Sequence, residues 1–267
     1  MESFPADAIN NRWEFGCLGF RPAAVNMAED EAAARRLLEG AGASTLRVYG
    51  WNPSAISIGL HQSFESIDMA RAARQGIDVI RRPTGGRAVL HAQEATYCVV
   101  MRVASGSVRE VYATIARGIQ RALHIIGIDA DLEVGIVRPA GPRGIARTLA
   151  CFSSVVGDEI SFKGRKLVGS AQRRYSLPDS TEVVLQHGSI LLGPAHLNIV
   201  DYLMPMSPAE RAFLQSQLRE RTTDASTILR RTVELDEMAE ALRSGFEQLW
   251  HEPLLTHVEP TTGILQS

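Results

Sequence analysis

A glycine pair in the first third of the chain, Gly85–Gly86, follows a segment with the composition of a strand, residues 77–80. Pro83 would end that strand, and the two glycines allow positive φ angles and close approach of a ligand to bare backbone. A glycine pair by itself is typical of an ordinary turn. Arginines precede this pair and a histidine follows it, so the run predicts a site for an anionic or acyl ligand. The residues predicted to bind that ligand are Arg82, Thr84, Gly85, Gly86 and His91.

Lys166 is a second candidate, at the start of a segment that alternates like a strand. Regular alternation places Lys166 on the same face as Val168 and Ser170. A lysine in a strand is usually a solvated charge at a sheet edge. Here the small residues that follow leave room for a ligand beside the ammonium, which could lose its proton or polarise a carbonyl, according to its neighbours. The small residues assigned to the binding site are Gly169, Ser170 and Ala171.

Cys151 is the candidate nucleophile among three cysteines. It follows an arginine-rich segment and precedes the Lys166 strand, and a nearby cation would lower the pKa of its thiol and increase the thiolate fraction. A thiolate can receive an acyl group that arrives as a thioester without any need for ATP. The alternative is a buried small hydrophobic residue. Cys17 and Cys98 are interpreted as structural.

The composition is that of an ordinary globular protein, with 267 residues, 45% hydrophobic and 22% charged. A net charge of −2 argues against a general nucleic-acid binder. The cysteines are few and widely spaced, which favours neither a disulfide framework nor a metal site and predicts a reduced, cytoplasmic setting. No apolar run approaches about 18 residues and the first residues lack a basic leader, so we expect neither a membrane span nor a secretory precursor.

The secondary-structure pattern mixes hairpins with interspersed helices. Asn26, followed three residues later by Glu29, predicts a helix start with acids in its first turn. The predicted strands are 46–49, 55–58, 77–80, 96–103 and 183–192, with a hairpin over 160–167, and further helices are predicted over 66–75, 108–126, 236–250 and from 207. This order predicts an α+β fold rather than a doubly wound sheet. We expect one catalytic domain over residues 1–267, with a helical C-terminal portion from about residue 205.

Four motifs, taken together and in order, resemble those of the lipoate/biotin protein ligase and octanoyltransferase superfamily. They are Asn26–Glu31, Leu46–Trp51, Arg81–His91 and Gly164–Gln172, and the similarity covers roughly residues 20 to 200. The resemblance implies a mixed β-sheet flanked by helices, of the class II synthetase and biotin-protein-ligase kind. It also implies that Lys166 contacts the acyl carbonyl and that His187 lines the site.

Within the superfamily the chain looks most similar to the ligase-like octanoyltransferases. ATP-dependent lipoate ligases carry an Arg-Asn-Asp type segment where this chain has Cys151 and Phe152, and the ligase-like transferases place their nucleophile at this position. The other transferase class places it downstream of the lysine, and no cysteine follows Cys151. Arg87 stands where the ligases usually have a third glycine, which agrees with the transferases. Ala92 departs from both groups, which commonly have Asp there.

We therefore predict an enzyme that moves octanoyl from acyl carrier protein, through a thioester on Cys151, to a lysine of an apo lipoyl domain. The acceptors would be lipoyl domains of 2-oxoacid dehydrogenase complexes or the glycine-cleavage H protein. Backbone amides near the glycine pair or the ammonium of Lys166 would stabilise the oxyanion, and a group near Lys166 or His91 must accept the proton of the amine. His91 itself is either a satisfied core histidine or part of the acyl or lysine channel.

Three alternatives to this prediction stay open at this point. They are an ATP-dependent lipoate or octanoate ligase, an amidotransferase that moves the acyl group between lipoyl proteins, and a catalytically silent protein that binds lipoyl domains. We expect no cofactor, no metal, no nucleic acid and no membrane among the partners.

Overall fold

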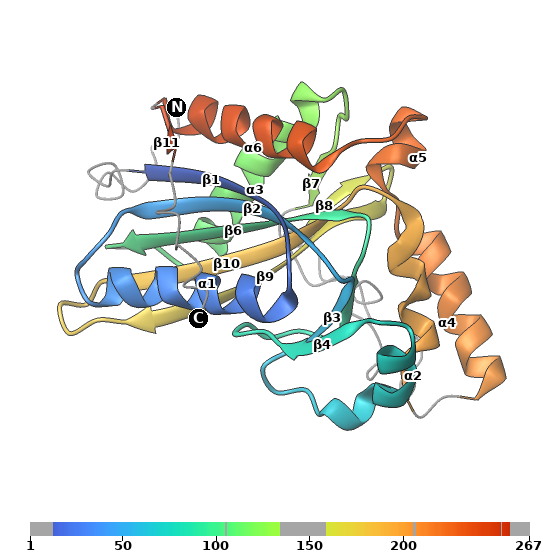
Figure 1. The fold of residues 1–267 in the computed structure, drawn as a ribbon. Coiled ribbons are helices and arrows are strands. Elements are labelled where there is room, and N and C mark those ends of the chain that lie inside the picture. Colours follow the sequence, from blue (N-terminus) through green and yellow to red (C-terminus); the bar gives the residue numbers. More distant parts are fainter. Residues whose placement is uncertain (1–12, 105, 134–158, 205–206, 252, 257–267) are drawn as a thin grey trace, which may run out of the picture.

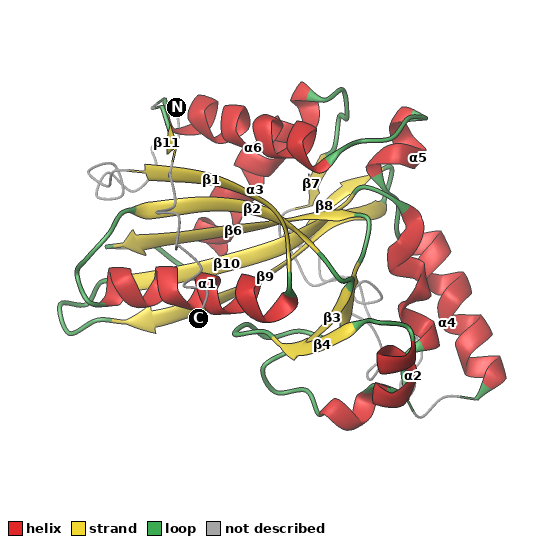
Figure 2. Cartoon of the chain, viewed as in Figure 1, coloured by secondary structure: helices red, strands yellow, loops and turns green. Residues whose placement is uncertain are grey.

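The computed structural model of the protein describes residues 13–104, 106–133, 159–204, 207–251 and 253–256. Two β-sheets and the helices around them make up these residues (Figures 1 and 2). The larger sheet has eight strands in the order β11-β1-β2-β6-β10-β9-β8-β7, and the smaller has three in the order β4-β3-β5. We refer to them below as the main sheet and the small sheet.

The main sheet is mixed. β1 runs parallel to β2 and β11, whereas the pairs from β2 through β6, β10, β9 and β8 to β7 are antiparallel. Its strands are β1 (Trp13–Arg21), β2 (Ser44–Trp51), β6 (Glu94–Val103), β7 (Asp131–Glu133), β8 (Glu159–Phe162), β9 (Arg165–Ser176), β10 (Glu182–Leu191) and β11 (Leu255–Thr256). The predicted α+β fold with a mixed sheet flanked by helices is confirmed.

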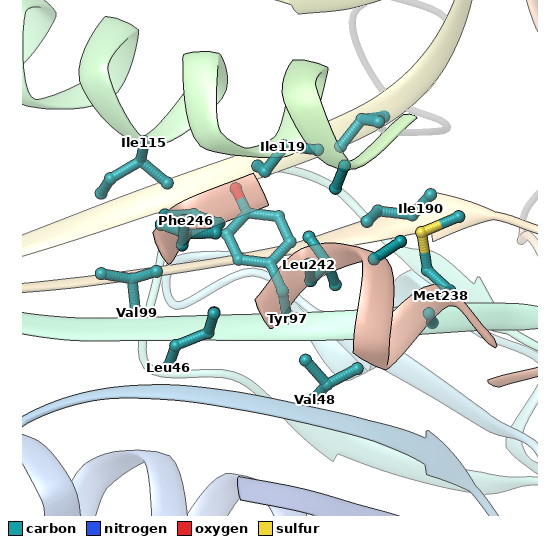
Figure 3. Close-up of a cluster of buried hydrophobic side chains, with 14 of the residues drawn as sticks. Leu46, Val48, Tyr97, Val99, Ile115, Ile119, Ile190, Met238, Leu242 and Phe246 are labelled. Carbon is teal, nitrogen blue, oxygen red and sulfur yellow. The ribbon is translucent and has the colours of Figure 1, made fainter. Parts of the chain in front are cut away.

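Helices α3 (Val108–Ile125) and α6 (Leu235–Trp250) pack together on one face of the main sheet (Figure 1). The capping box predicted at the start of α3 is present, since the Ser107 hydroxyl accepts from the Glu110 amide and the Glu110 carboxylate accepts from the Ser107 amide. Figure 3 shows side chains of α3 and α6 meeting those of β2 and β6 in the main hydrophobic core.

Helix α1 (Ala23–Leu38) lies on the opposite face of the main sheet (Figure 1). It begins three residues before the predicted start, because Pro22 is its extended N-cap residue. Asn26 is therefore not a cap. Its buried side chain donates to the Gly50 carbonyl at 3.0 Å and so ties α1 to β2. The acids of this helix lie beyond the first turn, contrary to the prediction.

The small sheet lies on the same side of the main sheet as α1 (Figure 1). Its strands are β3 (Ala55–Ile58), β4 (Asp78–Arg81) and β5 (Val89–His91), and the glycine-rich turn joins β4 to β5. Around it pack the short 3-10 segment η2 (Phe64–Ser66), α2 (Met69–Arg74), the 3-10 segment η4 (Pro194–Asp201) and α4 (Pro208–Arg221). The helix predicted over 66–75 is shorter than expected, because Asp68 caps α2 through the Arg71 amide.

Helix α5 (Ala225–Leu229) follows α4 in the described part of the chain. The predicted hairpin between β8 and β9 is present, with Lys163 and Gly164 both at positive φ in its turn. The loop predicted around residues 138–144 lies outside the described residues. None of the helices described here combines the length and the apolar character that crossing a membrane requires.

Candidate functional site

A pocket opens between the main sheet, α1 and the glycine-rich turn, with an empty volume of about 420 Å³ that includes open solvent at its mouth. The walls combine aliphatic and aromatic side chains with a few polar groups, as ligand sites commonly do. The lining residues are Met27, Trp51, Ser57, Arg82, Val89, His91, Thr96, Gly169, Ser170, Ala171, His187, Gly188 and Ser189. The structure thus brings together most of the residues that were predicted from the sequence to bind a ligand.

The small residues of β9 leave the space for this pocket. Ala171 pairs with His187 of β10, and Gly169 pairs with Ser189. Because paired residues of neighbouring strands point to the same face, these positions border the pocket together. A larger side chain at Gly169 or Ala171 would extend into the space beside His187.

The glycine-rich turn approaches the end of β3 by backbone alone. A Cβ atom on Gly59 would lie 1.9 Å from the Gly86 carbonyl oxygen, so no side chain fits there. Gly86 has a φ of +94°, the conformation that the sequence predicted for a glycine in this turn. At Gly85 a Cβ atom would meet nothing within 4 Å, so this residue borders open space. The two glycines therefore have different functions in the turn.

Arg81 and Arg82 both hold backbone carbonyls around the turn. The Arg82 guanidinium donates to the Gly85 carbonyl at 2.7 and 3.1 Å, and to the Arg87 carbonyl at 2.8 Å. It also donates to the Ser57 hydroxyl at 3.0 Å. Arg81 donates to the carbonyls that follow β3. These contacts fix the shape of the turn, while Arg82 also borders the pocket.

His91 is a buried histidine with both ring nitrogens near hydrogen-bonding partners, and it also lines the pocket. Its Nδ1 lies 2.8 Å from the Glu94 carboxylate and its Nε2 lies 2.7 Å from the Ser57 hydroxyl. Its ring stacks on Trp51, with the centroids 4.1 Å apart. Because the Glu94 carboxylate only accepts hydrogen bonds, His91 donates to it from Nδ1, and Nε2 faces the Ser57 hydroxyl, to which Arg82 also donates.

Asp30 of α1 is the residue that sequence reasoning missed. Its carboxylate is fully buried, pairs with Arg47, and accepts from the Tyr49 hydroxyl at 2.8 Å and from His187 Nδ1 at 3.0 Å. Burial alone would raise the pKa of Asp30, but the hydrogen bond from His187, the charge of Arg47 and the hydrogen bond from Tyr49 outweigh it and hold this pKa below its ordinary value. Asp30 is therefore ionised at neutral pH.

Thr84 extends this cluster into the glycine-rich turn. Its hydroxyl lies 2.6 Å from Nε2 of His187, and both side chains are buried. The signal for Asp30 in the sequence was its place in the stripe of α1 that faces the sheet, one turn after Asn26 and three residues after Met27. An acid on a stripe that a helix buries needs a partner, and here it has several.

Lys166 is buried, but regular alternation gave the wrong face for it. Val168 pairs with Ile160 while Lys166 pairs with the next residue, Ser161, so β9 contains a bulge with Leu167 as the extra residue. Leu167 and Val168 both pack in the main core. Because a bulge reverses the alternation on one side of it, Lys166 does not share the face of Val168. Its backbone carbonyl accepts from the Thr223 amide at 3.0 Å, and it is not among the lining residues of the pocket.

The three cysteines differ in what the structure shows of them. Cys151, the predicted nucleophile, lies outside the described residues. Cys98 is buried on β6 beside Arg47, and burial together with the nearby Asp30 charge raises the pKa of its thiol well above the ordinary value. Such a thiol is a poor nucleophile. Cys17 lies on β1 and is exposed. Among the residues described here, no group of His, Cys, Asp and Glu side chains is placed to hold a metal ion.

Comparison with known proteins places this site in a family. Residues 22–247 match the model of the lipoyl protein ligase A/B catalytic domain. The chain belongs to this family. It is 38% identical over 246 residues to octanoyltransferase LipM of Symbiobacterium thermophilum, and the alignment covers 89% of this chain and 86% of that protein. It is 32% identical over 254 residues to octanoyltransferase LipM of Bacillus subtilis, and the alignment covers 93% of this chain and 88% of that protein.

Solved structures of the family share the fold. A bi-partite lipoate protein ligase from Thermoplasma acidophilum aligns with a TM-score of 0.70 at 20% identity, over 94% of this chain and 89% of that one. A lipoate-protein ligase A bound with ATP aligns with a TM-score of 0.70 at 23% identity, over 93% of this chain and 90% of that one. The family-level prediction from the sequence is confirmed, and octanoyl transfer in lipoate biosynthesis is the activity that the chain shares with its octanoyltransferase relatives.

Proposed function

We propose that the chain moves an octanoyl group from acyl carrier protein, through a thioester on Cys151, to the amine of a lysine on a lipoyl domain or on the glycine-cleavage H protein. The acceptors would be the apo lipoyl domains of 2-oxoacid dehydrogenase complexes. The whole chain, residues 1–267, would act as one catalytic domain in a cytoplasmic setting. The octanoyltransferase relatives support the identity of the transferred group, and a structural neighbour that is a lipoate protein ligase supports a lipoyl-domain acceptor.

The pocket is the observation that carries this proposal. Its apolar lining residues, Met27, Trp51 and Val89, suit an alkyl chain, and the small residues of β9 leave the space for it. Because a Cβ atom on Gly85 would meet nothing within 4 Å, a ligand could approach the backbone of the turn there, and its amides would stabilise negative charge that develops on an acyl carbonyl. Transfer of an acyl group from a thioester to a thiolate needs no nucleotide. This agrees with Arg87, which stands where the ATP-dependent ligases usually have a third glycine.

The donor and the covalent intermediate are tested together. Purified protein should modify an apo lipoyl domain when octanoyl carrier protein is the only donor. Without acceptor, intact mass spectrometry should show one octanoyl adduct that is absent in Cys151→Ala and retained in Cys98→Ala. Activity only with free octanoate and ATP would identify a ligase. An adduct that persists in Cys151→Ala would exclude this nucleophile, and transfer from one lipoyl protein to another as the preferred reaction would identify an amidotransferase.

Lys166 is proposed to polarise the acyl carbonyl, a role that needs both its charge and its position. Lys166→Arg keeps the charge but replaces a compact ammonium with a planar fork, so we expect a folded protein whose transfer rate falls on the order of a hundredfold or more. Lys163→Arg is the matched control, because Lys163 lies in the adjacent turn with its Nζ over the Phe162 ring at 5.3 Å. Equal and mild effects of the two changes in single-turnover transfer would remove Lys166 from the site.

A further inference from the structure

Three side chains from distant parts of the sequence form a row of hydroxyl, imidazole and carboxylate. The Thr84 hydroxyl lies 2.6 Å from His187 Nε2, and His187 Nδ1 lies 3.0 Å from the Asp30 carboxylate. Thr84 comes from the glycine-rich turn, His187 from β10 and Asp30 from α1. An imidazole held between a carboxylate and a hydroxyl is the arrangement that makes histidine a proton acceptor in acyl-transfer sites.

The protonation of this row follows from its contacts. Asp30 is ionised, so His187 donates its Nδ1 proton to the carboxylate. Nε2 then keeps its lone pair and accepts the hydroxyl hydrogen of Thr84. His187 also lines the pocket. An imidazole thus borders the space where the acyl group would bind, with its Nε2 directed at the Thr84 hydroxyl of the glycine-rich turn.

His91, the other pocket histidine, is less suited to accept a proton along the same kind of path. The hydroxyl on its Nε2 belongs to Ser57, and the Arg82 guanidinium already donates to that hydroxyl at 3.0 Å. A proton that moved through Ser57 to His91 would therefore arrive beside an existing positive charge. Both histidines have a carboxylate at Nδ1, Glu94 at 2.8 Å from His91 and Asp30 at 3.0 Å from His187. They differ in the hydroxyl at Nε2, which belongs to Ser57 for His91 and to Thr84 of the glycine-rich turn for His187.

We propose that His187 is the base that takes the proton of the acceptor lysine ammonium through the Thr84 hydroxyl, with Asp30 as the residue that positions it. This inference rests on the proposed function in one respect, namely that the acceptor is an amine. The ammonium gives one proton to Thr84, whose own proton passes to His187 Nε2. The neutral amine then attacks the thioester carbonyl, a C–N bond forms, and the C–S bond breaks with its electron pair on sulfur. The nitrogen's second proton goes to the sulfur, and His187 later releases its proton to water.

The charges around His187 permit this protonation. Asp30 faces it from α1, Arg47 and Tyr49 from β2, Cys98 pairs with it on β6, and Arg82 borders the pocket from the turn. Arg47 is shared between Asp30 and Glu29, and Glu29 also pairs with Arg21 at 3.0 Å. In this network two carboxylates, Asp30 and Glu29, pair with two guanidiniums, Arg47 and Arg21, and Arg82 adds a third guanidinium at the pocket wall.

The test is the pH dependence of single-turnover octanoyl transfer to an apo lipoyl domain. His187→Gln should lower the rate at neutral pH on the order of a hundredfold or more and remove the loss of activity at acid pH that titration of the base causes. Thr84→Val should also be slow, whereas Thr84→Ser, which keeps the hydroxyl, should recover most of the rate. His124→Gln, on the exposed face of α3, is the control and should behave as wild type.

Asp30→Asn separates positioning from packing. Without the carboxylate charge, protonated His187 loses its counter-ion, so the acid side of the rate profile should shift to lower pH. A structural effect alone would lower the rate at every pH and leave the profile in place. If Asp30→Asn does not fold, as judged by circular dichroism, the His187 and Thr84 variants still decide the question.

A second acceptor isolates the proton transfer. Hydroxylamine is already neutral at neutral pH, so octanoyl transfer to it should recover most of the rate that His187→Gln loses with lysine. Equal losses with both acceptors, or an unchanged pH profile in His187→Gln, would overturn the proposal. So would an octanoyl adduct in Cys151→Ala that Thr84→Val abolishes, because Thr84 would then be the nucleophile. Failure of the amine-acceptor assignment would appear in the wild type, as transfer to hydroxylamine without transfer to a lipoyl domain.

Discussion

One face of the main sheet buries an almost wholly apolar core, whereas the other combines an apolar cluster under α1 with buried charged groups. On one face, Val48 of β2 and Tyr97 and Val99 of β6 meet the helices α3 and α6 in an apolar core (Figure 3). On the other face, Arg47 of β2 and His187 of β10 meet Asp30 of α1 and the glycine-rich turn. Alternation along each strand is enough to keep the two sets apart.

The largest hydrophobic core therefore lies on one face of the main sheet, and the residues of the candidate site lie on the other. The apolar face stabilises by burial, and its cost on mutation follows the volume removed. The face under α1 also buries an apolar cluster, which includes Met27, Tyr49 and Leu185, but its buried charged groups are stable only when they are paired with one another. A change to one of these charged groups therefore affects folding and reactivity together. The following predictions test this division, beginning with the largest expected effect.

Phe246→Ala should remove stability without changing the site. Phe246 of α6 is fully buried and its ring lies against Gly118 of α3. We expect the free energy of unfolding in urea to fall by about 3–5 kcal/mol. Phe213→Ala on α4, where the side chain is 53% exposed, is the control and should change it by less than about 0.5 kcal/mol. A transfer rate per folded molecule that fell along with stability in Phe246→Ala would contradict the separation of the two faces.

Asp30→Asn should lower stability at neutral pH by about 3 kcal/mol, because it leaves a buried cation with one partner fewer, although Arg47 keeps Glu29. The pKa of Asp30 is lower in the folded protein, so its contribution is present above the unfolded value of about 3.9 and is lost as the pH falls through the folded value. Unfolding midpoints of the wild type should therefore drop as the pH falls below about 3.9, and those of Asp30→Asn less so. Glu31→Gln, an exposed neighbour on α1, should follow the wild type.

Tyr97→Phe should have the smallest effect, since it removes one hydrogen-bonding group from the apolar face and leaves the ring in place. The Tyr97 hydroxyl donates to Ser170 at 2.6 Å and accepts from Gln186 at 3.0 Å. Burial, offset in part by these two hydrogen bonds, raises the pKa of Tyr97 to about 12. We expect a loss of about 1 kcal/mol in urea unfolding. A loss of unfolding free energy as large as that of Phe246→Ala would mean that the hydrogen bonds of Tyr97 with Ser170 and Gln186, and not hydrophobic burial, stabilise this face.

Local patterns in the sequence predicted the parts of the fold that depend on local contacts. The capping box at Ser107 and the turn at Lys163 and Gly164 need only residues a few positions apart. Asn26 looked like a cap because it precedes Glu29 at the right spacing, but Pro22 starts the helix first. At Lys166 the alternation failed because the bulge depends on pairing with β8, which the sequence of β9 alone does not show.

That Arg82 and His91 border a pocket could be predicted because glycines and a nearby histidine form a compact motif, and their role in binding stays a prediction. Asp30 could not be identified as part of the site, since its partner His187 lies 157 positions away and its ionisation depends on Arg47 and Tyr49 of another strand. Cys151 lies outside the described residues, so its role remains a prediction from the resemblance and is settled by mass spectrometry.

The wide separation of Thr84, His187 and Asp30 in the sequence has a consequence for how activity appears during refolding. Thr84 and His187 are 103 positions apart, and His187 and Asp30 are 157. Contacts between such distant positions close long loops and tend to form slowly, whereas helices such as α3 form from neighbouring residues. Recovery of octanoyl transfer after dilution from urea should therefore lag behind recovery of the helical circular dichroism signal. The transfer rate would then report when the long-range contacts of the site form, late in refolding.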